Sequence, residues 1–242
     1  LKEDLNYVTK DKMIILFYHI PLRNSSNIKN CVQILNLLKG FSEVHLMAGH
    51  THYNENYIYN SPIVAYEHIH GAACGAWWHS TLNLDGTPNG YAVYEIKGSS
   101  ISNWFYKPTK LSKDFQIRLH KGDDVFGGEY GLYSFGLGSN TIVANIWNFD
   151  PQWSIEVFEN GVKVENLNKF SSRDAWTVGY HCGVLNRSLD NYDKQCKHLF
   201  LHTMINSNAT IEIRATDRFG NVYTQNEIVS DYVTATSYDY LK

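Results

Sequence analysis

The chain contains 242 residues, of which 43% are hydrophobic and 19% charged, and its formal net charge is −3 at pH 7. This length allows one large domain or two ordinary ones with a packed core. The slightly acidic balance excludes the basic footprint of a nucleic-acid-binding protein, and the lack of any run of about 18 apolar residues excludes a membrane-spanning helix.

Residues 13–48 predict a strand–helix–strand unit. The apolar run MIILFY (Met13–Tyr18) predicts a strand that is buried on both faces. Helical spacing of apolar residues predicts a helix from Ile28 to Leu38, with Gly40 as its stop and with candidate caps at Ser25, Ser26 and Asn27. A second strand follows at Val44–Ala48, so we expect a βαβ unit with a right-handed crossover.

From about residue 56 to residue 106, apolar residues recur at every second position, the period of a β-strand. The segments 61–69, 77–84, 90–96 and 102–107 are typical of antiparallel strands, with turns at DGTPNG (85–90) and KGSS (97–100). The polar segment KPTKLSKD (107–114) is the predicted boundary, which gives a domain at 1–110 and a second at 111–242.

The second domain is predicted to be an all-β, immunoglobulin-like sandwich. Short alternating segments such as FQIRLH, TIVANIW and HLFLHTMI recur between turn signals such as ENG and RFGN, as in that architecture. Residues 171–196 lack such a period and predict a long loop with a helical turn. The whole chain is therefore expected to be α+β.

Three histidines are candidate metal ligands. His19 follows the first predicted strand, and His50 and His52 follow the second. The carboxyl ends of parallel strands meet at one edge of a sheet, so these side chains should gather there, and neutral imidazole is a common metal ligand. The single residue between His50 and His52 turns their rings in different directions, which suits two adjacent ions. One ion in a three-histidine site remains an alternative, as does an ordinary surface or core role.

The motifs FYHIPL (17–22) and AGHTH (48–52) resemble the calcineurin-like metallophosphoesterases. The likeness continues through GAACGAWW, DGTPNGY and NWFYK to ANIWNFDPQWSIEVFENG and IEIRATDRFGNVY, which are similar to a bacterial branch with an appended C-terminal β-domain. The resemblance implies the C-terminal part of a four-layer α/β/β/α domain followed by the sandwich. It also implies two divalent or trivalent ions (Fe, Zn or Mn), with His19 and His50 on one and His52 on the other, and hydrolysis of a small phosphate ester.

The acidic motifs of that family do not occur before His19, where it has Asp-x-His, Gly-Asp-x-x-Asp and Gly-Asn-His-Asp/Glu. The chain starts with Leu1 in what reads as the tail of a helix, so we expect a fragment whose metal site is incomplete. No catalytic residue is assigned within it, and we expect it to be inactive alone and to associate with the missing N-terminal segment or with another chain. The alternative is a non-catalytic scaffold built on a binding or attachment β-domain.

Four further residues are candidate substrate contacts. His68, His70, Trp77 and Trp78 lie in the region of resemblance, where the tryptophans could stack on an organic group. Packing at a sheet edge explains the histidines equally well.

Other residues favour structural roles. Asn83 and Asp85 faintly resemble a calcium loop, but a hairpin turn explains them better, and Asp217 and Arg218 predict a local ion pair. Trp147, Trp153 and Trp176 are expected to be buried rather than to form a carbohydrate platform, and the spacing of Cys182 and Cys196 permits a disulfide. Abundant Tyr and Asn, with few Lys, favour a periplasmic or secreted bacterial protein.

Overall fold

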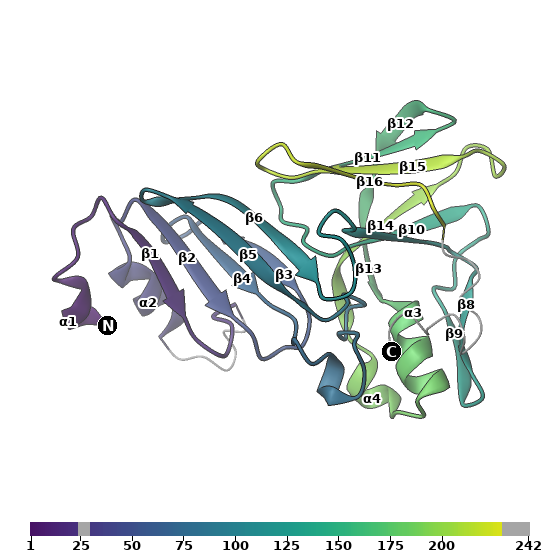
Figure 1. The fold of residues 1–242 in the computed structure, drawn as a ribbon, viewed down its shortest axis with the longest axis horizontal. Coiled ribbons are helices and arrows are strands. Elements are labelled where there is room, and N and C mark those ends of the chain that lie inside the picture. Colours follow the sequence, from purple (N-terminus) through teal and green to yellow (C-terminus); the bar gives the residue numbers. More distant parts are fainter. Residues whose placement is uncertain (24–29, 229–242) are drawn as a thin grey trace.

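A computed structural model describes residues 1–23 and 30–228 of the chain (Figure 1). In its N-terminal half, three parallel strands and one antiparallel strand form a sheet in the order β1-β2-β4-β3. The elements are α1 (Lys2–Leu5), β1 (Met13–Phe17), α2 (Cys31–Leu37), β2 (Glu43–Ala48), β3 (Glu55–Tyr59) and β4 (Ala65–Ile69).

The two faces of this sheet are covered differently. Alternate residues of β2 point to opposite faces, so Val44 and Leu46 pack with Leu35 of α2, whereas Met47 packs with Trp104 of a hairpin on the other face. That hairpin consists of β5 (Gly90–Lys97) and β6 (Ser100–Pro108) and crosses the sheet in Figure 1. The described residues thus form helix, sheet and hairpin layers, and the fourth layer of the predicted α/β/β/α arrangement is not confirmed.

Three predictions for this half are corrected by the structure. Strand β1 is half-buried rather than buried on both faces, because it forms the edge of the described sheet and leaves Phe17 75% exposed. Strand β4 pairs with β2 in parallel, not antiparallel. The segment 77–84 is not a strand, since Trp77 and Trp78 adopt positive φ angles within the short 3₁₀ helix η1 (Ala76–Trp78). The predicted caps Ser25, Ser26 and Asn27 lie outside the described residues.

The C-terminal half contains two four-stranded antiparallel sheets that pack face to face. Their strand orders are β13-β14-β10-β7 and β12-β11-β15-β16. Their facing residues, among them Leu119, Ile142, Val157 and Ile213, form one fully buried core. Trp147, Trp153 and Trp176 are buried as expected. The strands are β7 (Ile117–Lys121), β10 (Thr141–Ile146), β11 (Ser154–Glu159), β12 (Val162–Asn166), β13 (Asn168–Arg173), β14 (Gln195–Thr203), β15 (Ile211–Thr216) and β16 (Val222–Gln225).

A helical subregion covers one end of the sandwich. The segment predicted as a long loop with one helical turn contains three short helices, α3 (Ala175–Val178), the π-helix η2 (Gly179–Val184) and α4 (Leu189–Tyr192). Helices α3 and η2 pack with the two-stranded ribbon β8 (Val125–Gly128) and β9 (Gly131–Ser134), and α4 packs on α3 and η2. Val178 and Tyr192 also pack on Ala76 and Leu84, so this subregion touches the loop that follows β4.

A buried polar network joins the two halves. Arg118 of the sandwich donates to the carbonyl oxygen of Gly86 at 2.8 Å and to Asp174 at 3.0 Å. The Asp85 carboxylate lies 2.8 Å from His198 Nε2, and the Asp85 carbonyl accepts from Asn145. The turn at residues 85–87 is therefore held from the sandwich side, as a buried structural element.

The cysteines do not form the disulfide that their spacing permits. Cys182 and Cys196 are both free and buried, and the Cys196 thiol lies against the Asp85 carbonyl and His198. Burial raises the pKa of both thiols. They are therefore packed as apolar, protonated side chains.

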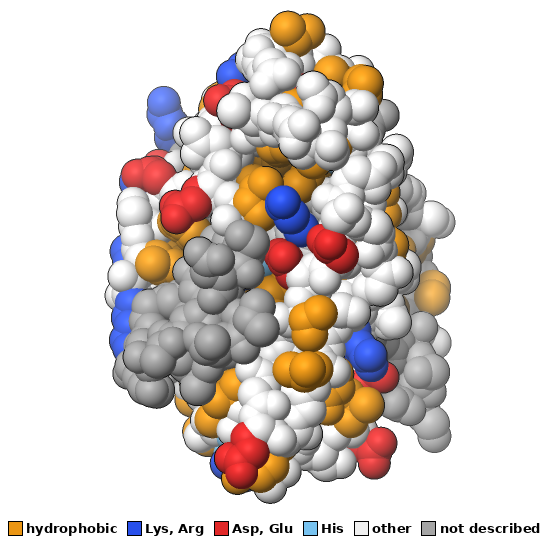
Figure 2. Space-filling model, turned by 90° about the vertical axis from the view of Figure 1, so that its right-hand side faces the viewer, with side chains coloured by type: hydrophobic (Ala, Val, Ile, Leu, Met, Phe, Trp, Pro, Cys, Tyr) orange, Lys and Arg blue, Asp and Glu red, His pale blue; other side chains and the backbone are white. Residues whose placement is uncertain are grey.

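The sandwich end of the surface carries charges of both signs. Figure 2 shows Lys and Arg side chains interspersed with Asp and Glu and with apolar groups on that face, where side chains are described. Within residues 1–23 and 30–228, none of the helices has the length and apolar composition that a membrane crossing needs.

Candidate functional site

His19 and His50 meet beyond the carboxyl ends of β1 and β2. The Nε2 atom of His19 lies 3.2 Å from the Nδ1 atom of His50, and their ring centroids are 5.0 Å apart. The pairing of the two strands continues past their ends, because the backbone N–H of Gly49 donates to the carbonyl oxygen of His19 at 3.1 Å. The parallel register therefore brings these two imidazoles together, as the sequence predicts.

A buried carboxylate holds the loop that carries His19. Glu67 of β4 is fully buried and accepts four hydrogen bonds. Its Oε1 accepts from the Tyr18 hydroxyl at 2.7 Å and the Leu22 N–H at 2.6 Å, and its Oε2 accepts from the Arg23 N–H at 3.1 Å and the Tyr59 hydroxyl at 2.8 Å. Burial, reinforced by the Glu67 charge, raises the pKa of both tyrosines, which keeps them protonated as donors. Three of the four donors flank His19, so Glu67 fixes the position of that loop.

The loop with the other two histidines is strained. His50 and His52 have φ angles of 71° and 57°, a region that residues other than glycine rarely adopt. Such conformations each cost about 1–3 kcal/mol and persist where the surroundings enforce them, most often at functional sites. The strain is an independent indication that this loop is built for the placement of its imidazoles.

His52 turns towards the tryptophans. Its ring stacks on Trp77 with centroids 4.9 Å apart, and the backbone N–H of Trp77 donates to His52 Nδ1 at 3.3 Å. Burial lowers the pKa of His52, a hydrogen bond with the Gly75 backbone opposes this, and the charges of His50 and His19 lower it further. The neutral imidazole, which is the metal-binding form, is thereby favoured.

The two facing nitrogens of His19 and His50 fit a shared ion. Two imidazole nitrogens on one tetrahedral ion, each about 2.0–2.1 Å from it, are separated by about 3.3 Å. The separation of 3.2 Å matches that value. Across the part of the chain that the structure describes, however, no group of three or more His, Cys, Asp or Glu side chains has the placement of a metal site. This donor set thus fits part of a metal centre.

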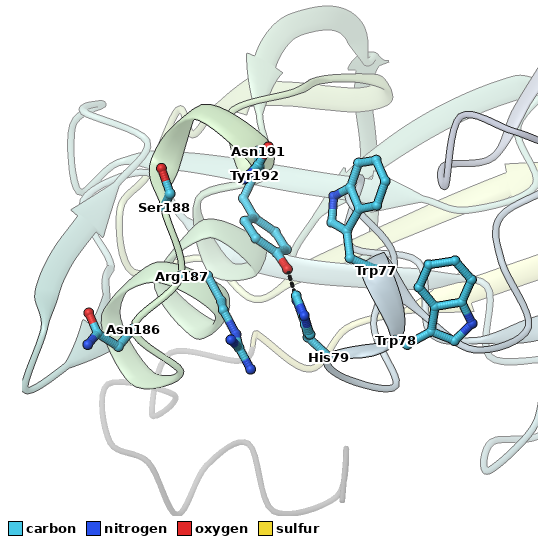
Figure 3. A pocket seen from close by; sticks show the side chains of 8 residues that line it. All are labelled: Trp77, Trp78, His79, Asn186, Arg187, Ser188, Asn191 and Tyr192. Carbon is cyan, nitrogen blue, oxygen red and sulfur yellow. Dashed lines mark hydrogen bonds between the residues drawn. The ribbon is translucent and has the colours of Figure 1, made fainter.

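Trp77, which stacks on His52, lines a pocket of about 540 Å³ (Figure 3). One wall consists of Trp77, Trp78 and His79. The other consists of Asn186, Arg187, Ser188, Asn191 and Tyr192. The Tyr192 hydroxyl lies 2.6 Å from His79 Nδ1 and connects the walls. Sequence reasoning missed the second wall, because nothing in the local pattern of residues 186–192 indicates that they face the tryptophans.

His68 and His70 do not line this pocket. His68 is buried, with its Nε2 2.9 Å from His45 Nδ1 and its Nδ1 2.9 Å from Asn56 Oδ1. His70 lies 3.0 Å from the Tyr94 hydroxyl and lines a separate apolar groove between β1, β2 and β5. Of the four candidate substrate contacts, the structure brings only Trp77 and Trp78 to the pocket beside the metal-candidate histidines, and the substrate roles remain predictions.

Comparison with known proteins gives one match. Residues 67–223 match the family model described as the C terminal of calcineurin-like phosphoesterase. The matched range begins in β4 and runs through the hairpin, the pocket walls and both sheets of the sandwich. No curated protein and no solved structure matches the chain.

Proposed function

The chain belongs to the calcineurin-like phosphoesterases by its C-terminal region, and on that premise we propose that it carries one side of the metal centre of a phosphoric ester hydrolase. His19 and His50 would hold one ion and His52 a second, with Fe, Zn or Mn as candidates. The carboxylate ligands would come from polypeptide outside these 242 residues. The substrate would be a small phosphate ester.

The facing pair of His19 Nε2 and His50 Nδ1, 3.2 Å apart, carries this proposal. The pair lies at the carboxyl edge of parallel strands, where open α/β sheets gather their ligands. When bound, the ions supply Lewis-acid charge at the phosphate and lower the pKa of water. The chain's own part is positional: the Glu67 hydrogen bonds hold His19, and the strained loop holds His50 and His52.

An open apolar groove supports the docking of further polypeptide next to the histidines. Among the described residues, strand β1 is an edge of its sheet, and its N–H and C=O groups on that side are a template for another strand. The adjoining groove has a volume of about 560 Å³. Phe17, Tyr91 and Ile96, which line it, are 75%, 56% and 56% exposed. A covering segment would complete the layered domain and bring its carboxylates to the metal edge.

The sandwich order supports an immunoglobulin type for the appended domain. Taken in chain order from β7 to β16 without β8 and β9, the eight strands form sheets in the orders 5-6-2-1 and 4-3-7-8. Immunoglobulin domains with an added C′ strand have the sheets D-E-B-A and C′-C-F-G, which is the same arrangement. We propose this topology for the second half of the chain.

Metal titration of the purified chain tests the proposal. We expect Zn²⁺ or Mn²⁺ to bind, measured by calorimetry and by elemental analysis after gel filtration, and His19→Ala or His50→Ala to weaken binding at least about tenfold. His79→Ala, outside the trio, is the matched control. Equal binding by all four proteins would contradict the assignment. Metal-dependent hydrolysis of 4-nitrophenyl phosphate by this chain alone would refute the claim that the carboxylates come from outside it.

A further inference from the structure

We infer that the pocket between Trp77, Trp78 and Arg187 binds the organic part of the substrate, and that this part carries a planar ring with hydrogen-bond acceptors. The inference rests on the proposed function only because that function places the phosphate at His19, His50 and His52. The pocket itself is defined by side chains of this chain alone (Figure 3).

The aromatic wall is exposed and yet held in place. Trp77 and Trp78 are 40% and 74% exposed, which is unusual for the largest apolar side chains of a folded protein. Both have positive φ angles, 52° and 59°, in a region that bulky residues rarely adopt. The fold therefore maintains a strained backbone that presents two indole rings to solvent rather than burying them. Backbone strain of this kind concentrates at ligand-binding positions.

The aromatic wall is continuous with the metal-candidate loop. Trp77 stacks on His52, with an angle of 29° between the ring planes, and Trp78 contacts the same ring edge-on at 5.9 Å between centroids. A phosphate at the histidines would place the next group of the ester beside these indoles. A ring with a π-face is the group that gains most from such surfaces, since stacking of one base on an aromatic side chain contributes about 1–3 kcal/mol.

The opposite wall is polar. Asn186, Arg187, Ser188 and Asn191 line it, and Figure 3 shows their side chains across the pocket from the indoles. The backbone N–H of Arg187 donates to the His181 carbonyl at 2.9 Å, which fixes the start of that side chain on the buried π-helix η2. A guanidinium group only donates hydrogen bonds, so its ligand must offer acceptor atoms.

The size of the pocket agrees with this class of ligand. About 540 Å³ is within the range of small-molecule sites, roughly 300–1,000 Å³. The Tyr192–His79 contact of 2.6 Å ties the two walls, so their spacing is set by the fold and not by the ligand. Nucleotides and acceptor-bearing aryl phosphates share the required chemistry, a phosphate plus a planar ring with acceptors.

Calorimetric titration of the complete chain with chelator present tests the pocket independently of metal. The probes are adenosine 5′-monophosphate, ribose 5-phosphate as the ring-free analogue, and 4-nitrophenyl phosphate as the aryl ester. The variants are Trp78→Ala and Arg187→Gln, both at exposed positions, with Tyr7→Ala, which is 89% exposed and remote from the pocket lining, as control. Circular dichroism confirms that each variant is folded.

We expect at least one of the two ring-bearing probes to bind about tenfold more tightly than ribose 5-phosphate, Trp78→Ala to abolish that preference, and Arg187→Gln to weaken the preferred probe about fivefold. Preference for the nucleotide or for the aryl ester identifies the source of the ring. Equal binding of all three probes, or variants that behave like Tyr7→Ala, would overturn the inference. Failure of metal binding with the ring preference intact would refute the proposed metal centre and leave the pocket assignment standing.

Discussion

Replacement of Glu67 by glutamine or alanine should loosen the loop that carries His19 without touching a candidate ligand. The carboxylate is fully buried and satisfies two backbone N–H groups and two tyrosine hydroxyls. Glutamine keeps the size of the side chain but turns an acceptor oxygen into an NH₂ group, which faces donors. Alanine removes all four acceptor contacts and leaves a cavity.

The magnitude follows from the number of bonds. A hydrogen bond to a charged group contributes about 1.5–3 kcal/mol, and a buried donor left unsatisfied costs about 1–3 kcal/mol. Glu67→Gln leaves two of the four donors unsatisfied and should lower the free energy of unfolding by about 2–6 kcal/mol. Glu67→Ala leaves all four unsatisfied and should cost at least about 4 kcal/mol, in the range that is exceptional for single substitutions. Because residues that orient metal-binding histidines affect affinity about 10–100-fold, metal affinity should fall by at least tenfold in both.

Urea unfolding followed by tryptophan fluorescence measures the first effect, and metal calorimetry under native conditions measures the second. Glu95→Gln is the matched control, since Glu95 is exposed on β5 and surface substitutions stay within about 0.5 kcal/mol. If Glu67→Gln matched Glu95→Gln in both measurements, the claim that Glu67 fixes the His19 loop would be refuted. A loss of stability with unchanged metal affinity would limit Glu67 to a folding role.

Three further predictions concern the sandwich and its junction. Burial lowers the pKa of His181 to about 3. Between pH 6.5 and pH 3 the unfolded chain therefore binds a proton that the folded chain does not, and the free energy of unfolding falls as the pH falls. At pH 5 this loss amounts to roughly 2 kcal/mol. His181→Gln should therefore flatten the decline of the urea midpoint between pH 7 and pH 5, and an unchanged slope would contradict the assignment. Arg118→Leu leaves the fully buried Asp174 carboxylate without its cation and should cost about 3–5 kcal/mol in the same assay, whereas a loss below 1 kcal/mol would show that the pair is dispensable. Val157→Ala opens a cavity in the fully buried sandwich core and should lower the free energy of unfolding by about 2 kcal/mol. If the free energy of unfolding did not change measurably, the two sheets would have relaxed to fill the cavity.

Features governed by local periodicity were predictable from the sequence. The strand–helix–strand unit, the hairpin turn at residues 97–100 and the alternating strands of the sandwich all follow from side-chain period and turn residues. The approach of His19 to His50 followed from the same reasoning, since parallel strands end at one edge.

Features governed by tertiary packing were not predictable. Arg218 was expected to pair with its neighbour Asp217, but it donates to Asp150 at 2.8 and 3.0 Å and stacks over Trp104 and Tyr66 at 4.5 Å. Periodicity describes which face of a strand is apolar, yet it does not name the partner of a long side chain. The polar wall at Arg187 was missed for the same reason.

The junction at residues 85–87 has a consequence for how this protein can be recombined. Because Arg118 and Asn145 hold the backbone of Gly86 and Asp85, the loop with the tryptophan wall completes its hydrogen bonding inside the sandwich. A chimera that exchanged the sandwich at the polar segment 107–114 would leave these carbonyl groups without their donors. The sequence gives no sign of this, because a polar segment is typical of a domain boundary. The family match, which begins within β4, likewise includes this loop together with the sandwich.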